Sequence, residues 1–169
     1  MQTLIANDKV KLVYTQKDDL PFVLEAEREA SLTGYVGLWP LEKHEATLTN
    51  PDELHLIVVN NAGDRVGYVI LRELTNENNR LELFRITITA KGQGYGEATL
   101  RLIKKWSFEV KKVNRLWLDV KGHNTANKLY EKIGFVQEGI LREAIKFNNG
   151  YEPLIIMSIL SSEYHREDK

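Results

Sequence analysis

The chain has 169 residues, 28% of them charged, and its formal net charge at pH 7 is −1. A chain of this length forms one domain of ordinary size, so we expect a single domain over residues 1–169 with a core spanning roughly residues 10–164. The near-zero net charge excludes a global field that would hold nucleic acid or a membrane surface.

Several kinds of site are excluded by composition. The absence of cysteine removes disulfides, thiolate metal sites and a cysteine nucleophile. The four histidines, at positions 44, 55, 123 and 165, show no ligand spacing, so we expect no metal site. Neither a signal peptide nor a long apolar run is recognisable, which predicts a cytoplasmic protein.

The first elements of the chain are a strand and two helices. Residues 10–14 read as a strand, and residues 15–19 supply capping side chains for a helix over residues 20–31. The irregular stretch 31–41 carries Tyr35 and Trp39. Such a loop lines a binding cleft or closes the edge of the core, and for Trp39 we favour the core edge. Pro40 suits the first turn of a helix over residues 41–49.

Three antiparallel strands follow, and then a strand–turn–helix segment around which the chain is organised. The strand patterns cover residues 54–59, 66–74 and 81–88. Glycines stand at positions 92, 94 and 96, and an apolar stripe at helical spacing then includes Leu102 and Trp106. Backbone N–H groups at a helix start are unpaired and lie at the positive end of the dipole, and glycine lets an anion approach closely. This segment therefore predicts a phosphate cradle, although a mere tight connection gives the same pattern.

Two common nucleotide loops do not fit this turn. A Walker loop requires Lys-Ser or Lys-Thr after its last glycine, whereas Glu97 and Ala98 follow Gly96. The spacing of the glycines also differs from the Gly-x-Gly-x-x-Gly of a Rossmann turn.

The rest of the chain predicts further strands and one helix. Residues 115–120 form a strand parallel to the one before the central helix. Asn124 caps a helix over residues 125–133, which Gly134 ends. Strands at 135–136, 140–147 and 154–160 close the fold, and the polar tail 161–169 is expected to fray. The fold class is a mixed α/β single domain. Trp106 and Trp117 are both predicted to lie in the core.

The turn KGQGYGEA and the later segment HNTANKLYEKIGF, in this order of elements, resemble the GNAT superfamily of acetyl-CoA-dependent N-acetyltransferases. The segments GILREA, NNGY and MSIL at 139–160 are similar to the closing hairpin of one branch, the ribosomal-protein N-terminal and spermidine acetyltransferases. The resemblance covers residues 10–164. It implies antiparallel N-terminal strands, then a parallel pair that splays around the cofactor, with flanking helices.

The resemblance also implies which residues hold acetyl-CoA. The family signature Gln/Arg-x-x-Gly-x-Gly/Ala matches Lys91, Gly94 and Gly96, with Lys91 departing from it; a register beginning at Gln93 matches the letters better. We prefer the first, because it places the apolar stripe of the helix where the family has it. In either register the pyrophosphate is expected on the loop formed by Lys91, Gly92, Gln93, Gly94, Tyr95, Gly96 and Glu97. The backbone of Ile86, Thr87 and Ile88 would hold the thioester.

A second family signature joins an Asn to a Tyr. Asn124 and Tyr130 match it, but one residue fewer separates Asn124 from Ala126 than the family usually has. That shortening puts the contact of Asn124 with the pantetheine arm in question. Lys132 stands where a basic residue reaches the 3′-phosphate of CoA.

The catalytic assignments follow from what acetyl transfer requires. Tyr130 is the candidate general acid for the CoA sulfur, with a packed structural tyrosine as the alternative. Glu82 is the first candidate for the base, with a solvated strand-end carboxylate as the alternative. Glu25 and Glu29 would attract a cationic substrate, or be simply solvated. A regular strand would point Arg85 to the face opposite Glu82, and we assign Arg85 no role.

Three functions are compared. The first is direct transfer of acetyl from acetyl-CoA to a small-molecule amine or a protein N-terminus, without a metal, a nucleic acid or a membrane as partner. The second is a non-catalytic acyl-CoA-binding module, and the third, disfavoured by the missing Walker residues, is a nucleotide-binding protein. A homodimer is compatible with the exposed strand edges, and many family members form one.

Overall fold

The computed structural model describes residues 1–167 and contains one mixed sheet of eight strands in the order β1-β2-β3-β4-β5-β6-β8-β7. The strands are β1 (Thr3–Ala6), β2 (Val10–Tyr14), β3 (Glu53–Asn60), β4 (Arg65–Arg72), β5 (Arg80–Ile88), β6 (Arg115–Lys121), β7 (Val136–Phe147) and β8 (Gly150–Leu160). Among these described residues, no helix is long and apolar enough to cross a bilayer.

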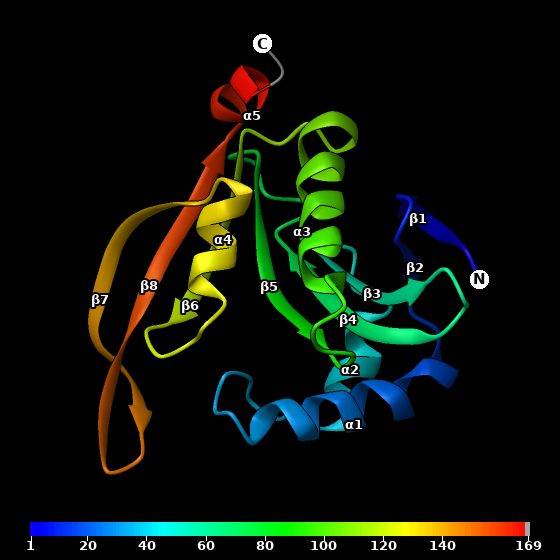
Figure 1. Ribbon diagram of the computed structural model, residues 1–169, viewed down its shortest axis with the longest axis horizontal. Coiled ribbons are helices and arrows are strands. Elements are labelled where there is room, and N and C mark those ends of the chain that lie inside the picture. Colours follow the sequence, from blue (N-terminus) through cyan, green and yellow to red (C-terminus); the bar gives the residue numbers. More distant parts are fainter. Residues whose placement is uncertain (168–169) are drawn as a thin grey trace.

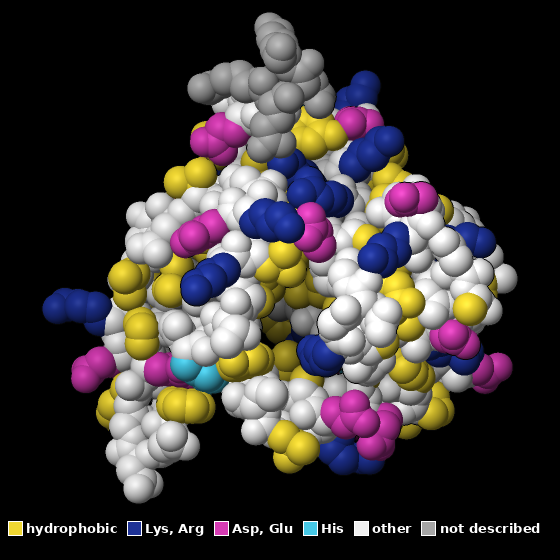
Figure 2. Space-filling model, viewed as in Figure 1, with side chains coloured by type: hydrophobic (Ala, Val, Ile, Leu, Met, Phe, Trp, Pro, Cys, Tyr) yellow, Lys and Arg dark blue, Asp and Glu magenta, His cyan; other side chains and the backbone are white. Residues whose placement is uncertain are grey.

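Helices cover both faces of the sheet (Figure 1). They are α1 (Leu20–Ser31), α2 (Leu41–Thr47), α3 (Tyr95–Lys105), α4 (Asn127–Ile133) and α5 (Ser161–Glu167), with a 3-10 turn, η1 (Lys17–Asp19), before α1 and a π-helical turn, η2 (Trp106–Val110), after α3. Helices α3 and α4 pack on one face, and α1 packs on β4 and β5 from the other. Acidic and basic side chains are interspersed over the face shown in Figure 2, as the near-zero net charge suggests.

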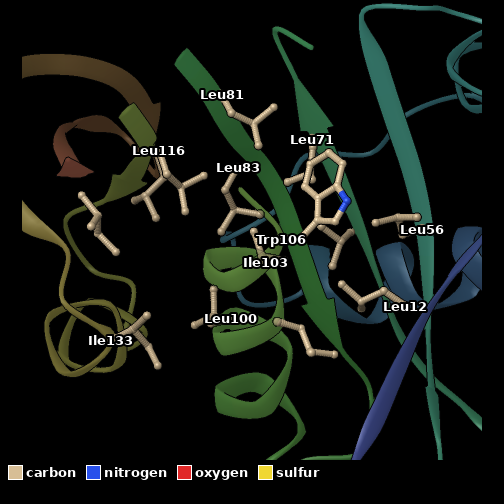
Figure 3. Close-up of a cluster of buried hydrophobic side chains, with 14 of the residues drawn as sticks. Leu12, Leu56, Leu71, Leu81, Leu83, Leu100, Ile103, Trp106, Leu116 and Ile133 are labelled. Carbon is tan, nitrogen blue, oxygen red and sulfur yellow. The ribbon is translucent and has the colours of Figure 1, made fainter. Parts of the chain in front are cut away.

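The larger hydrophobic core lies between the sheet and helix α3 (Figure 3). Leu100 and Ile103 on one side of α3, and Trp106 at the start of η2, pack against Leu81 and Leu83 of β5. Trp106 is 7% exposed, so its predicted place in the core is confirmed. A smaller core, which includes Val23 and Ile57, fills the space beneath α1.

The strands β5 and β6 are a parallel pair connected through α3, as predicted. They are paired only where residues 80–82 face residues 115–117. Beyond that point β6 continues to pair with β8 as far as Lys121, and β5 continues to pair with β4 as far as Ile88. Because both strands keep their outer partners while losing each other, the sheet opens between them.

Strand β5 contains a β-bulge where the opening begins. Leu83 faces Leu71 and Arg85 faces Ile70, so Phe84 is the extra residue. A bulge shifts the alternation of side chains by one residue. Leu83 therefore faces α3, whereas Phe84 and Arg85 both face α1, on the same side of the sheet as Glu82. The prediction that Arg85 points away from Glu82 is wrong for this reason.

Several element boundaries differ from the predictions. Strand β1 was not predicted, because Thr3–Ala6 is a short edge strand with no buried residue. Strand β7 is continuous over Val136–Phe147, since bulges accommodate its irregular sequence. The tail was predicted to fray, but Ser161–Glu167 forms α5, where the Tyr164 ring stacks on Phe108 at 4.9 Å. Residues 168 and 169 of that predicted tail lie outside the described residues.

The prediction that Trp117 is buried in the core is wrong. Burial alternates along β6, with Leu116 and Leu118 buried and Trp117 only partly buried on the other face. Its indole N–H donates a hydrogen bond of 2.7 Å to the carboxylate of Glu73. The apolar composition of β6 suggested a strand covered on both faces, whereas only the face towards α3 and α4 is fully covered.

Candidate active site

A cavity of about 750 Å³ occupies the opening between β5 and β6, and Figure 2 shows the surface hollowed at the middle of this face. Its walls come from both sides of the sheet. The end of β5, the glycine turn, the start of α3 and helix α4 form one part, and the end of α1 with the loop at 33–37 forms another. The cavity therefore passes through the sheet where the strands separate, and two molecules entering from opposite faces would meet inside it.

The glycine turn at one end of the cavity has the geometry of an anion cradle. Gly92 and Gly94 have φ angles of +72° and +76°, a region that residues with a Cβ rarely adopt. Gly94 is the N-cap of α3, and no side chain within residues 1–167 caps that helix. A Cβ built on Gly92 would meet no atom within 4 Å, so the approach to the backbone is open. Unpaired N–H groups at the positive end of an eleven-residue helix suit a phosphate group.

A lysine that we did not predict adds positive charge to this cradle. Lys9, from the turn between β1 and β2, places its Nζ 2.9 Å from where a Cβ of Gly94 would lie, and 5.9 Å from the centre of the Tyr95 ring. Lys91 lines the same cavity. Lys9 lies far from the glycines in sequence, and only the pairing of β1 with β2 brings it here, so no local motif would have revealed it.

The predicted cofactor residues divide into two groups. Those that line the cavity are Ile86, Thr87, Ile88, Lys91, Gly92, Gly94, Tyr95, Gly96 and Asn124. Gln93, Glu97 and Lys132 lie outside its lining. The ammonium of Lys132 instead forms a salt bridge of 2.8 Å with Glu97. Hydrogen bonds from Lys132, and then from Arg101, hold the pKa of Glu97 below its usual value.

Asn124 closes the turn that leads into α4. Its side-chain oxygen accepts a hydrogen bond of 2.9 Å from the N–H of Ala126, and its own N–H donates to the carbonyl of Lys121 at 3.0 Å. The helix itself begins at Asn127 rather than at the predicted residue 125. Asn124 therefore caps a turn before the helix rather than the helix itself. Gly134 ends α4 with φ +114°, as predicted.

Tyr130 lies on the buried side of α4, lines the cavity, and is 7% exposed. Its ring meets Phe135 edge to face at 5.8 Å. Among residues 1–167, no hydrogen bond joins its hydroxyl group to another side chain. Burial raises the pKa of Tyr130 to about 12, so the phenol keeps its proton at neutral pH. A buried hydroxyl group without a protein partner is available to a ligand.

Glu82 does not line the cavity. It lies in the paired part of β5, between Arg72 on β4 and Trp117 on β6. Burial, followed by the negative charge of Asp119, raises the pKa of Glu82 to about 7. Glu82 thus has the protonation behaviour of a base at neutral pH but lacks direct access to the cavity.

Asp119 lines the cavity and was not predicted. It stands on β6 two residues beyond Trp117 and faces the same side of the sheet as Glu82. Its side chain is exposed at the cavity, yet partial desolvation by the surrounding protein raises the pKa of Asp119. The feature of the sequence that could have indicated Asp119 is its single carboxylate within the otherwise largely apolar strand sequence RLWLDV.

The wall opposite α3 is formed by the loop after α1 and by the closing hairpin. Tyr35 and Glu29 line the cavity from α1 and its loop, and Ile145 lines it from β7. The His123 ring stacks on Phe147 at 4.3 Å and lies 5.0 Å from the ring of Tyr35, so it joins this loop to the hairpin. Helix α2 does not contribute to the cavity lining.

Arg85, which was given no role, lines the cavity at the bulge and belongs to a buried polar cluster. Its guanidinium pairs with Glu27 of α1. The Glu27 carboxylate also accepts hydrogen bonds from the Tyr68 hydroxyl at 3.0 Å and the Trp39 N–H at 2.8 Å, and lies 3.2 Å from the ring of His44. Trp39 therefore packs at the core edge, as favoured. Within the described residues, no group of three or more His, Asp or Glu side chains has the arrangement of a metal site.

Known proteins with similar sequences and structures share this architecture. Residues 39–135 match the model of the family described as Acetyltransferase (GNAT) family. The chain is 32% identical to a spermidine N(1)-acetyltransferase of Escherichia coli (strain K12) over 95% of this chain and 90% of the relative. It is 35% identical to a [ribosomal protein bS18]-alanine N-acetyltransferase of Haemophilus influenzae, over 55% of this chain and 63% of that one. The structure of a Vibrio cholerae spermidine N-acetyltransferase in complex with CoA and spermine superposes with a TM-score of 0.85 at 24% identity, covering 94% of this chain and 99% of the other.

Proposed function

The chain belongs to the GNAT acetyltransferase family and is an N-acetyltransferase, and on that premise we propose that it joins acetyl-CoA and a primary amine inside the cavity between β5 and β6. The observation that carries the proposal is the passage through the sheet, with a glycine cradle at one end and the buried phenol of Tyr130 inside. Transfer is direct, without an acyl-enzyme, because the chain has no cysteine and its cavity lining contains no serine.

The cradle fits the pyrophosphate of acetyl-CoA. The amides between Gly92 and Glu97 would hold it, with Lys9 and Lys91 adding positive charge. Residues 83–88 of β5 pair with β4 on one edge only, so their other backbone groups face the opening and are available to the pantetheine arm and the thioester carbonyl. Acetyl-CoA supplies an acetyl group activated as a thioester.

Tyr130 serves as the general acid. Its phenol keeps a proton at neutral pH and has no competing hydrogen bond within residues 1–167. A thiol has a pKa of about 8.5 in water, well below that of this phenol. The same buried surroundings also raise the pKa of a thiol. The difference between the pKa of the thiol and that of the phenol is therefore smaller for a sulfur beside Tyr130. The hydroxyl group donates its proton to the sulfur as negative charge develops there.

The acceptor enters from the side of α1. Carboxylates at Glu29 and Asp119 line that half of the cavity, which favours an amine that arrives as a cation. A polyamine fits this charge, and the chain is 32% identical to a spermidine N(1)-acetyltransferase over 90% of that relative. A protein N-terminus is the second candidate, favoured by the similarity to the ribosomal-protein acetyltransferase.

A thiol-release assay with acetyl-CoA tests the proposal. The panel contains spermidine, spermine, a peptide beginning with alanine, and buffer without amine. We expect release with at least one amine above the blank, and mass spectrometry should find the product heavier by one acetyl group. Binding of CoA without release for any member of the panel would instead support a non-catalytic acyl-CoA-binding module.

A further inference from the structure

Two carboxylates lie on one face of the sheet where β5 and β6 begin to separate. Glu82 is the last residue of β5 paired with β6, and its partner is Trp117. Side chains alternate along a strand, so Asp119, two residues after Trp117, faces the same side as Trp117 and Glu82. Glu82 is therefore inside the paired sheet, and Asp119 is one step further along, where the sheet has opened.

The two carboxylates differ in their access to the cavity. Asp119 lines it, together with Tyr130 and Arg85, whereas Glu82 does not. A proton released by an amine in the cavity would thus meet Asp119 first. Glu82 lies next to the opening, in the paired part of the sheet.

The charged groups that face this pair are already engaged elsewhere. Arg72 pairs with Glu53 at 3.0 Å, and its guanidinium lies 3.4 Å from the centre of the Phe84 ring. Arg80 pairs with Glu73 at 2.8 Å. Glu73 also accepts a hydrogen bond from the Trp117 indole. No ion pair or hydrogen bond among residues 1–167 joins either carboxylate of the pair to a cation, so both remain free to take a proton.

The electrostatic consequence is a raised pKa at both carboxylates. Burial and the neighbouring Asp119 charge raise the pKa of Glu82 to about 7, against the weaker opposite effect of Arg72. Asp119 is exposed where it lines the cavity, but partial desolvation by the surrounding protein still raises its pKa, with Arg72 again opposing. Carboxylates with raised pKa values accept a proton from an ammonium group more readily than ordinary ones.

We propose that Asp119 accepts the proton of the acceptor ammonium group and that Glu82 acts through Asp119, by receiving this proton and raising the basicity of Asp119. This inference rests on the proposed acetyl transfer. An N–H bond of the ammonium breaks and an O–H bond forms on Asp119. The nitrogen then bonds to the acetyl carbon, the carbon–sulfur bond breaks, and Tyr130 protonates the sulfur. The second proton of the amine leaves by the same carboxylates to solvent, which also returns a proton to Tyr130.

The test compares Asp119→Asn, Glu82→Gln and the wild type, with Asp18→Asn as the matched control, since Asp18 is exposed and lies outside the cavity lining. Spermidine and the alanine-starting peptide are the acceptors. Asp119→Asn should lower kcat by about 100-fold or more, while CoA affinity and Tm stay within error. Asp119→Glu should restore part of the rate. Glu82→Gln should retain more activity than Asp119→Asn. It should also move the acidic limb of the pH profile of kcat/KM to lower pH.

A second readout needs no turnover. Carboxyl-carbon NMR of the protein without ligand should show Glu82 titrating near pH 7 in the wild type and in Asp18→Asn. In Asp119→Asn the Glu82 midpoint should fall by on the order of one pH unit, because a nearby like charge has been removed.

The possible failures are distinguishable. An active wild type with an unchanged rate, pH profile and Glu82 midpoint in Asp119→Asn would overturn the proton route and leave the proposed function intact. Loss of CoA affinity or Tm in Asp119→Asn would assign Asp119 a structural role and also overturn it. No thiol release by the wild type with either acceptor would overturn the proposed function and this inference together.

Discussion

The carboxylate of Glu27 on α1 forms an ion pair with the guanidinium of Arg85 on β5 in the interior of the protein, where the two side chains are 1% and 9% exposed. Burial alone would raise the pKa of Glu27, but hydrogen bonds from His44 and the Trp39 backbone, together with the Arg85 charge, hold it below its usual value. Helix α1, which forms one wall of the cavity, is thereby attached to β5 beside the bulge at Phe84.

Glu27→Gln should lower the free energy of unfolding by about 3–5 kcal/mol, because it leaves the Arg85 charge buried without its partner. Urea unfolding followed by circular dichroism measures this. The control is Glu25→Gln on the same helix, whose partner Arg28 is exposed, and which should change stability by less than about 0.5 kcal/mol. Equal effects of the two substitutions would contradict the role given to the buried pair.

Gly92→Ala should weaken CoA binding by about tenfold. The φ of +72° costs a residue with a Cβ roughly 1–2 kcal/mol, and relaxation of the turn moves the amides away from the anion. Isothermal titration calorimetry with CoA checks this. Gly63→Ala is the matched control, since Gly63 has φ +90°, equally open space at Cβ, and lies in the turn between β3 and β4. Gly63→Ala should destabilise the protein by about as much as Gly92→Ala does, and should leave the affinity for CoA unchanged.

Tyr130→Phe should lower kcat by about 100-fold or more with CoA affinity nearly unchanged, because only the hydroxyl group is lost. Tm should not fall, since within residues 1–167 that hydroxyl group bonds to no other side chain. Tyr151→Phe, at a tyrosine that is 61% exposed, controls for the substitution. A Tyr130→Phe enzyme with the wild-type rate would remove Tyr130 from the mechanism.

Lys132→Gln should weaken CoA binding about two- to fivefold and leave the affinity for dephospho-CoA unchanged, if Lys132 exchanges Glu97 for the 3′-phosphate. Glu97→Gln should have the opposite effect on CoA, because it releases Lys132 and Arg101 from their shared carboxylate. Competition binding with the two cofactors provides the measurement. A parallel loss of both affinities in Lys132→Gln would contradict contact with the 3′-phosphate.

Local patterns predicted most of the fold. The helix over Leu20–Ser31, the strand and helix around the glycine turn and the stop at Gly134 depend on neighbouring residues, which the sequence displays directly. The short edge strand β1 and the terminal helix α5 depend on contacts with distant elements, β2 for one and Phe108 for the other. Such contacts leave little trace in local composition.

The site was predictable to the extent that it is built from consecutive residues. The turn from Lys91 to Gly96 and the position of Tyr130 on α4 are local features. Lys9 and Asp119 are brought to the site by strand pairing. The orientation of Arg85 depends on a bulge that the local sequence does not indicate. The cluster of His44, His55 and Glu27 joins residues far apart in the chain, so histidines that appear scattered in sequence are in contact.

The bulge at Phe84 has a consequence for how β5 tolerates changes in length. Deleting Phe84 would remove the extra residue, so Leu83 and Arg85 would face Leu71 and Ile70 in a regular ladder, and the side chains on either side of the gap would keep their faces. Deleting Thr87 instead, with the bulge and the pairing to β4 kept, would turn Ile88 to the opposite face of the sheet. The deletion at Thr87 should therefore damage the cavity far more than the deletion at Phe84.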